Sequence, residues 1–341
     1  MTDMQLDTWA EAVDEFPLLA SDEDKLRALV HYAVLAPSDH NRQPWIFRLH
    51  HDRLELRADR TRAMPVRDPA DRALMISLGA ALFHLRLAAR RFGRHLLVSA
   101  LPEPGDRDLV ALVRLGADEA PTLDERRLFS AIPQRRTNRF PFEDRHVSLP
   151  VAEEIRRAAP AEGAWALRVT ADQQSALADL IAEGDRRLLA DARIRHERAA
   201  WMHANRSSLR DGLPGFVSGV GDLASLLGPF VARHFDRGAT EAARDHELAE
   251  HAPLLLVLGS AGDEPVDWLV TGQALARVLL TARDAGLQAS FLNQAVEVDE
   301  LRNRLRALLG HAGVPQLVLR IGYARRVRPT PRRPVGEVLA V

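Results

Sequence analysis

Cysteine is absent from the sequence, and this absence excludes several kinds of chemistry. A chain of 341 residues without cysteine has no disulfide, no thiolate nucleophile and no cysteine-bound metal. Lysine is nearly absent as well, because Lys25 is the only lysine among 46 basic residues. Any site for an anion must therefore be built from arginine. The formal net charge of −1 gives no reason to expect a nucleic acid as a partner.

Long hydrophobic runs are also absent. The longest, at 252–259 (APLLLVLG), is far too short to span a membrane and predicts a buried strand. Residues 1–30 are acidic and show no basic stretch followed by an apolar one, so no secretory signal is visible. With 46% hydrophobic and 27% charged residues, the composition is typical of a globular protein of one large or two smaller domains. We expect a cytoplasmic protein that binds no membrane.

The histidines show no metal-site pattern. Those in 246–251 (HELAEH) are five residues apart, whereas a zinc-binding H-E-x-x-H motif places them four apart on one helix face. We expect the histidines to be surface or core residues, and we predict no metal.

Local patterns predict alternating helices and strands. The expected elements are a helix capped by Ser21 at 22–35, strands at 45–50 and 54–58, an apolar helix at 71–92 that ends at Gly93, and strands at 96–101 and 109–115. The second half of the sequence repeats this plan. The matches, in order, are 36–49 with 159–169, 78–93 with 271–286, and 109–117 with 315–324. Chance similarity of alanine-rich helices is the alternative, but ordered matches favour duplication of one α+β unit.

We therefore expect two units, at 1–128 and 129–341, with the helices 71–92 and 267–286 paired at the centre. The second unit carries a long insertion at about 185–250. Its glycine-rich part, 210–230, suits a mobile flap over a pocket, and a plain helical decoration is the alternative.

The segment 36–45 (APSDHNRQPW) concentrates small polar groups between a predicted helix and a predicted strand. Such a segment is either a structured turn or a ligand-binding loop. Its counterpart in the second unit, at 159–165, makes the same connection with fewer residues, of which fewer are polar. The turn alone does not require the polar residues, so we favour a ligand-binding loop.

Two arginine clusters accompany this loop. One lies at 132–142 (IPQRRTNRFPF) and the other at 325–334 (RRVRPTPRRP). The planar fork of a guanidinium matches phosphate oxygens two at a time, and neighbouring hydroxyl or amide groups complete the contacts. A solvated arginine-rich surface is the alternative reading of each cluster on its own.

Together, these segments resemble the flavin-binding nitroreductase family, whose subunits carry an Arg-x-Ser-x-Arg/Lys phosphate motif and a Pro-Ser-x-x-Asn-x-Gln-Pro-Trp loop. RRTNR at 135–139 matches the first motif with Thr137 in the serine position, and PSDHNRQPW at 37–45 matches the second. In the family's homodimers, flavin mononucleotide (FMN) lies at the subunit interface. Here the first unit lacks the arginine motif and the second lacks the loop. The chain thus resembles the Acg group, a single-chain pseudo-dimer with one complete site and a lid-like insertion.

The resemblance also implies the cofactor contacts. It assigns Pro37, Ser38, Asn41 and Gln43 to the loop at the ring edge and ribityl chain, Arg135, Thr137 and Arg139 with Arg332 or Arg333 to the phosphate, and Leu292, Asn293 and Gln294 to the surroundings of flavin N5. The family often has a proline and a glutamate-glycine pair in the last segment, where this chain has Phe291 and Asn293-Gln294.

The function implied is that of an FMN-dependent oxidoreductase. NAD(P)H would reduce the flavin at N5, and a nitroaromatic or quinone-like acceptor would then take two electrons in a ping-pong reaction. Flavin N5 carries this chemistry, so the resemblance assigns no catalytic side chain. One alternative is a flavin-sequestering protein with a closed lid and little turnover, and another is a structural protein that has lost flavin. The chain could be a monomer or a homodimer.

Overall fold

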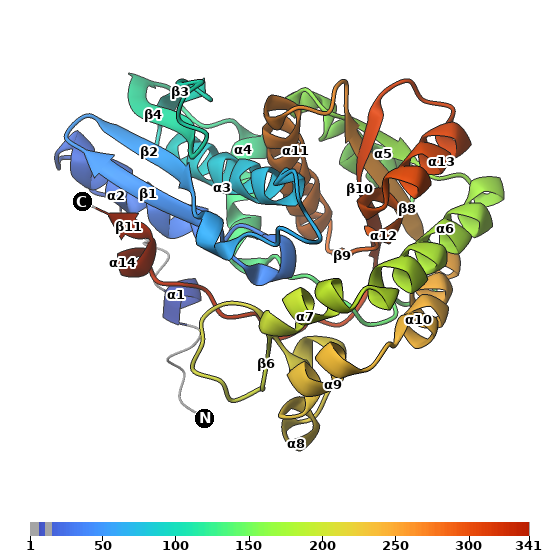
Figure 1. Ribbon diagram of the computed structural model, residues 1–341. Coiled ribbons are helices and arrows are strands. Elements are labelled where there is room, and N and C mark those ends of the chain that lie inside the picture. Colours follow the sequence, from blue (N-terminus) through green and yellow to red (C-terminus); the bar gives the residue numbers. More distant parts are fainter. Residues whose placement is uncertain (1–6, 11–15, 341) are drawn as a thin grey trace.

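Two β-sheets lie on either side of a pair of long central helices, α3 and α11 (Figure 1). The computed structural model describes residues 7–10 and 16–340. The first sheet has the strand order β11-β1-β2-β4-β3 and the second β5-β8-β10-β9. Every strand pair in the two sheets is antiparallel except β1 with β11. The predicted α+β class is confirmed.

The first half contains α1 (Asp7–Ala10), α2 (Asp22–Ala33), β1 (Trp45–His50), β2 (Arg53–Ala58), α3 (Arg72–Arg91), β3 (Arg94–Ala100), β4 (Leu109–Asp118) and α4 (Leu123–Ala131). The second half contains α5 (Leu149–Arg157), β5 (Trp165–Arg168), α6 (Ala171–Ala190), α7 (Ala192–Ala200), β6 (Met202–His203), β7 (Leu213–Pro214), α8 (Asp222–Ser225), α9 (Gly228–His234), α10 (Gly238–Glu250), β8 (Leu254–Ser260), α11 (Pro265–Asp284), β9 (Gln288–Phe291), α12 (Gln294–Glu297), α13 (Asp299–Leu309), β10 (Val314–Gly322), α14 (Val335–Val338) and β11 (Leu339–Ala340).

Local sequence signals explain most of the first half. Ser21 caps α2, since its hydroxyl accepts a hydrogen bond from the Asp24 N–H. The β1–β2 hairpin turns at the predicted place and alternates buried with more exposed residues. Gly93 and Gly286 follow α3 and α11 with φ of +77° and +83°, the left-handed conformation that ends many helices.

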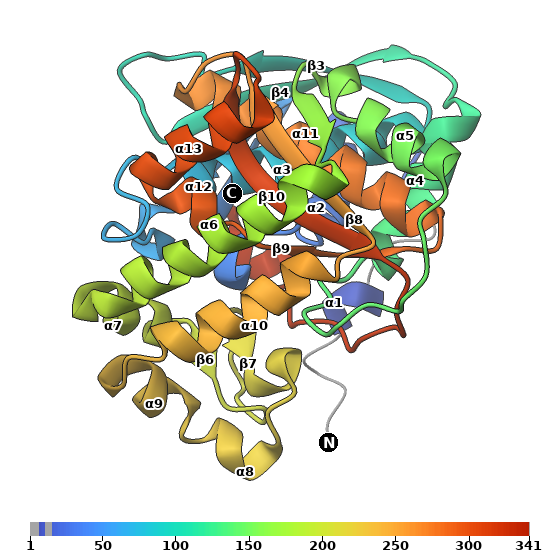
Figure 2. The same cartoon turned by 90° about the vertical axis from the view of Figure 1, so that its right-hand side faces the viewer.

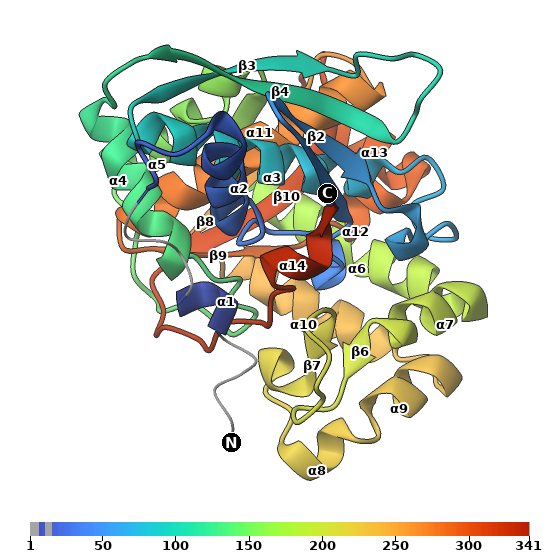
Figure 3. The same ribbon diagram turned by 90° about the vertical axis from the view of Figure 1, so that its left-hand side faces the viewer.

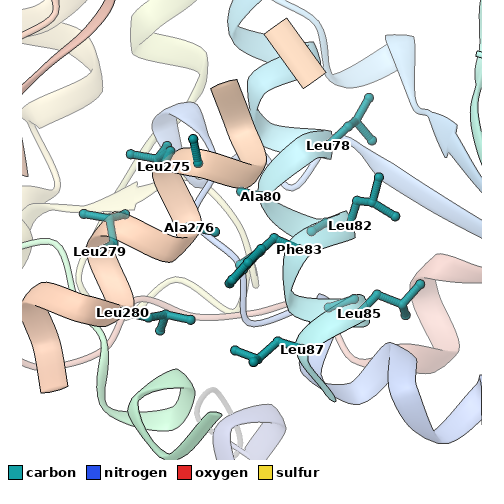
Figure 4. Packing of buried hydrophobic residues seen from close by; sticks show 14 of the residues in the cluster. Leu78, Ala80, Leu82, Phe83, Leu85, Leu87, Leu275, Ala276, Leu279 and Leu280 are labelled. Atoms are coloured by element: carbon teal, nitrogen blue, oxygen red, sulfur yellow. The ribbon is translucent and has the colours of Figure 1, made fainter. Parts of the chain in front are cut away.

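The central helices pack together where both lack a side chain. A Cβ on Gly79 of α3 would run into Leu269 O of α11, and one on Gly272 would run into Ile76 O of α3. These two glycines are equivalent positions of the sequence repeat. Leucine, alanine and phenylalanine side chains fill the contact beyond them (Figure 4). Among the described residues, α3 is the one helix long and apolar enough to cross a membrane, yet it is mostly buried, as expected of a core helix.

The two sheets follow the same order along the chain. In the first, β1 pairs with β2, β2 with β4, and β4 with β3. In the second, β5, β8, β10 and β9 occupy the corresponding places. The C-terminal tail of the second half then returns to the first sheet (Figure 1 and Figure 3). There Leu339 of β11 pairs with Phe47 of β1.

The halves differ most between their first two strands. Residues 51–52 connect β1 to β2, whereas 169–253 connect β5 to β8 and include α6 to α10. The expected insertion at about 185–250 lies within this longer connection. Helices α7 to α9 project from the body at the end of α6 and α10 (Figure 2). The glycine-rich part at 210–230 forms β7, a 3-10 turn, α8 and the start of α9.

Candidate functional site

A cavity of about 480 Å³ lies where both halves, the insertion and the C-terminal tail meet. This volume is within the range of small-molecule and cofactor sites. The predicted site residues that line it are Pro37, Ser38, Asn41, Arg135, Thr137, Arg139, Leu292, Asn293, Gln294 and Arg332. Positions spread over almost the whole sequence therefore share one cavity.

The polar loop at 37–43 has an unusual backbone. His40, Asn41 and Gln43 have φ of 48°, 55° and 53°, a region that residues other than glycine seldom adopt. Ser38 helps to hold this shape, since its Oγ accepts a hydrogen bond of 2.9 Å from the Gln43 N–H. Such conformations cost about 1–3 kcal/mol each and concentrate at ligand-binding sites.

Asn41 joins three parts of the molecule. Its Nδ2 donates to Gly212 O in the insertion (3.0 Å) and to Pro331 O in the tail (3.1 Å). Its Oδ1 accepts a hydrogen bond of 2.7 Å from Arg332. The side chain lines the cavity, but its polar atoms already hold the loop, the insertion and the tail together.

Gln43 and Arg333, which the resemblance assigns to the cofactor, do not line the cavity. Gln43 Oε1 accepts from the Arg333 N–H at 2.8 Å, and Gln43 Nε2 donates to Arg210 O at 2.8 Å. The side chain of Gln43 thus fixes the loop to the tail and to the insertion. A bond pattern of this kind depends on the tertiary fold and leaves no sign in the sequence.

Three arginines form a cationic group at one part of the cavity. Arg135 and Arg332 are each 3% exposed, and Arg136 packs beside them. Burial and the neighbouring Arg136 lower the pKa of Arg135 to about 9, and burial with both neighbours lowers the pKa of Arg332 well below its usual value. The Nε and Nη1 of Arg135 and the Nε of Arg332 have no hydrogen-bond partner among the described residues.

Trp9 of α1 covers this arginine group. Its ring centre lies 3.9 Å from the guanidinium carbon of Arg136 and 4.8 Å from that of Arg332. The indole N–H donates to Thr330 O at 2.9 Å, which fixes the ring against the tail. A lone tryptophan in an acidic segment carries no sequence signal for this role.

Arg139 belongs to a different charged group in the same cavity. Burial lowers its pKa to about 10, while Asp39 opposes the shift and Arg244 and Arg198 of the insertion add to it. Arg320 of β10 lies near Arg139, and its Nη2 donates to Asn138 O and Phe140 O. The charged neighbours of Arg139 thus differ from those of Arg135 and Arg332.

A chain of polar contacts, which sequence reasoning missed, supports the loop. Asp39 contacts His40 Nδ1 at 2.9 Å, His40 Nε2 faces Arg67 Nη1 at 3.0 Å, and Arg67 forms a forked ion pair with Glu297. Burial lowers the pKa of His40, so the ring is neutral at pH 7 and its Nε2 accepts from Arg67. Because each of these side chains is paired with the next, we interpret the chain of contacts as a structural support for the polar loop.

The β9–α12 junction supplies Leu292, Asn293 and Gln294. The Leu292 N–H donates to Val318 O, and Asn293 Oδ1 accepts from the Val318 N–H. The backbone donor of Leu292 and the side-chain oxygen of Asn293 are therefore used within the second sheet. Among the described residues, no group of three or more histidine or acidic side chains is placed to hold a metal ion.

The cavity between the two α+β halves is thus lined by buried arginines. No protein-family model matches the chain. The chain is 30% identical over 324 residues to an uncharacterised protein of Mycobacterium tuberculosis strain H37Rv, with 93% of each chain covered. It is 29% identical over 322 residues to the putative NAD(P)H nitroreductase Acg of the same organism, with 93% of this chain and 96% of the relative covered. The chain belongs to the nitroreductase-like family that includes Acg.

Solved nitroreductases give more distant matches. The FMN- and NADPH-dependent nitroreductase NfnB from Sphigopyxis sp. strain HMH aligns with a TM-score of 0.43 and 21% identity over 63% of this chain and 98% of that chain. A nitroreductase with bound FMN from Desulfitobacterium hafniense DCB-2 aligns with a TM-score of 0.37 and 12% identity over the same shares.

Proposed function

We propose that the chain is a single-chain FMN-dependent oxidoreductase that takes electrons from NAD(P)H and passes them to a nitroaromatic or quinone-like acceptor. The observation that carries this proposal is the buried arginine group with unpartnered guanidinium nitrogens. A buried cation is costly unless an anion pairs with it. The phosphate of FMN supplies that anion, and relatives named as NAD(P)H nitroreductases support the choice.

Within this proposal, Arg135, Arg136 and Arg332 hold the phosphate, and Thr137 adds a hydroxyl. Arg139 lies with a separate charged group, so we place it toward the flavin ring, where a cation favours the electron-rich reduced form. Pro37 and Ser38 face the cofactor from the polar loop. The N–H groups that follow Leu292 are the candidates for the N5 side, since the Leu292 donor is used in the sheet.

The bound flavin supplies the redox chemistry, and the protein supplies position, polarity and exclusion of water. Apolar side chains of the insertion, including Leu213 and Phe216, line the cavity and would shield it from solvent. Asn41 ties this segment to the loop through its bonds to Gly212.

The same contacts favour one alternative function. An insertion fixed over the ring would keep substrates away, and the protein would then sequester flavin with little turnover. The attachment of the glycine-rich segment to Asn41 is the observation behind this alternative.

Anaerobic mixing of the FMN-loaded protein with NADH and with NADPH distinguishes the two functions. Bleaching of the flavin absorbance by either donor, and its return on adding a quinone, supports the oxidoreductase. Flavin that stays oxidised with both donors but bleaches with dithionite supports sequestration. A colourless protein that cannot be reconstituted with FMN would overturn both.

We also propose that the chain is an intramolecular pseudo-dimer of units at 1–128 and 129–341. The matched strand orders, the facing glycines Gly79 and Gly272, and the return of the C-terminal tail to the first sheet support this division. One chain then contains the complete site, and the protein acts in the cytoplasm as a monomer or a homodimer.

A further inference from the structure

Two aspartates of the insertion face each other across one amide group. Gln294 Nε2 donates to Asp185 Oδ1 at 3.1 Å and to Asp245 Oδ2 at 2.6 Å. All three side chains line the cavity. Asp185 is only 5% exposed, and its Oδ2 is buried without a hydrogen-bond partner among the described residues. A buried carboxyl oxygen without a donor indicates a group that is not simply a satisfied carboxylate.

The close approach of three helices produces this arrangement. Asp185 lies on α6, Asp245 on α10 and Gln294 at the start of α12. Gly184 permits the contact, because a Cβ there would come within 2.7 Å of the Gln294 backbone. A larger residue at 184 would push α12 away and separate the amide from Asp185.

Charged groups of both signs surround the pair. Asp245 and Glu241 on α10 add negative charge, and Arg198 on α7, Arg67 before α3, Arg244 on α10 and Arg320 on β10 oppose it. Burial and then the neighbouring Asp245 raise the pKa of Asp185 to about 7, and burial raises that of Asp245. The two carboxyl groups therefore titrate as a coupled pair.

We propose that Asp185 and Asp245 hold one proton between them and deliver it to an oxygen of the bound acceptor as the acceptor is reduced. This inference rests on the proposed function and adds a general acid to it. Reducing a quinone to a hydroquinone requires two electrons and two protons. The reduced cofactor would supply two electrons and one of the protons together as a hydride, and would itself become oxidised. The carboxyl O–H breaks as the second hydroxyl of the product forms, and solvent then returns a proton to the pair.

The chemistry of the pair also indicates the kind of acceptor. A planar acceptor whose oxygen gains a proton, such as a quinone, benefits from a buried acid beside it. An acceptor that takes electrons alone, such as ferricyanide, gains nothing. This difference separates a proton donor from two residues that only position the insertion.

The first test measures whether the pair holds a proton, and it needs no activity. An acid with a raised pKa binds more protons folded than unfolded, so it reduces stability as pH rises from about 4 to about 7. Asp185→Asn should therefore raise the melting temperature of the cofactor-free protein more at pH 8 than at pH 5. Asp144→Asn, at an exposed loop position, is the control and should show no such dependence. An equal effect of Asp185→Asn at both pH values would overturn the inference.

The second test measures proton delivery in the FMN-loaded protein. Asp185→Asn should slow menadione reduction about 100-fold, within the usual range for a general acid, while ferricyanide reduction changes less than about twofold. In Asp245→Asn the fall of the quinone rate with rising pH should move to lower pH, because Asp185 loses its acidic neighbour. An unchanged quinone rate and pH profile in both variants would overturn the inference. Failure of the unaltered protein to reduce ferricyanide from NAD(P)H would instead overturn the proposed function.

Discussion

At the scale of single residues, the arginine group trades stability for binding. Arg135 is buried beside Arg136 and Arg332, and two of its nitrogens have no partner among the described residues. Replacing an uncompensated buried charge with an apolar side chain often stabilises a protein. Residues that bind a charged ligand commonly lower the folding stability of the ligand-free protein in this way.

We therefore expect opposite effects of Arg135→Met on folding and on binding. The cofactor-free variant should melt at the same temperature as the unaltered protein or higher, because the buried charge is gone. Its affinity for FMN should fall about 10- to 100-fold, as expected for a lost charge-assisted hydrogen bond of about 1.5–3 kcal/mol. Thermal melts and titrations followed by flavin fluorescence measure the two effects.

Arg126→Met is the matched control, since Arg126 is exposed on α4 and should leave FMN affinity unchanged. An unaltered FMN affinity in Arg135→Met would show that the phosphate does not bind at this arginine group.

The sequence motifs predicted that the arginine clusters and the polar loop contribute to one site, because the residue types in a short motif indicate their chemistry without knowledge of the fold. They could not separate Arg139 from Arg135, since the charged neighbours of Arg139 come from the insertion. They also missed Trp9 and the Asp185–Asp245 pair. Each depends on contacts between segments more than a hundred residues apart or between separate helices, and spacing along the chain does not encode such contacts.

At the scale of elements, the insertion depends on one glycine to reach the loop. Gly212 has φ of +64°, and an added Cβ would meet the His203 ring and lie 2.7 Å from Trp201 O. Its N–H and carbonyl bond with Asn41.

The helices α2, α3 and α11 and the β1–β2 hairpin were predictable from periodicity and caps. The secondary structure within 210–230 was not predictable, because short helices that are held by tertiary contacts show no clear hydrophobic period.

We expect Gly212→Ala to loosen the insertion and speed the release of FMN. The new methyl group is strained at this φ and displaces the bonds to Asn41. Release after dilution into excess apoflavodoxin or another flavin trap, followed by fluorescence, gives the rate. Gly221→Ala is the control, because φ there is −68° and an added Cβ meets nothing within 4 Å. Equal release rates for the two variants would contradict a lid fixed through Gly212.

At the scale of the whole molecule, the α3–α11 contact joins the two halves. Both helices contribute to the cavity, through Ile76 and Ser77 on one side and Leu275 on the other. The contact is closest at Gly79 and Gly272, where each added Cβ would strike the carbonyl of the facing helix. A backbone carbonyl cannot rotate aside as a flexible side chain can, so any larger residue must separate the helices.

We accordingly expect Gly79→Ala and Gly272→Ala to destabilise both halves together. Overpacking of a core usually costs about 1–3 kcal/mol, and rigid backbone on both sides puts these variants at the upper end. Calorimetry of the unaltered protein should show one unfolding transition, and each variant should lower its temperature without splitting it. FMN affinity should fall as well, because the helices that carry the cavity move apart. Gly105→Ala, where an added Cβ meets nothing within 4 Å, should change neither quantity. Two separate transitions, of which a glycine variant lowers only one, would show that the halves fold independently and that the shared contact does not couple them.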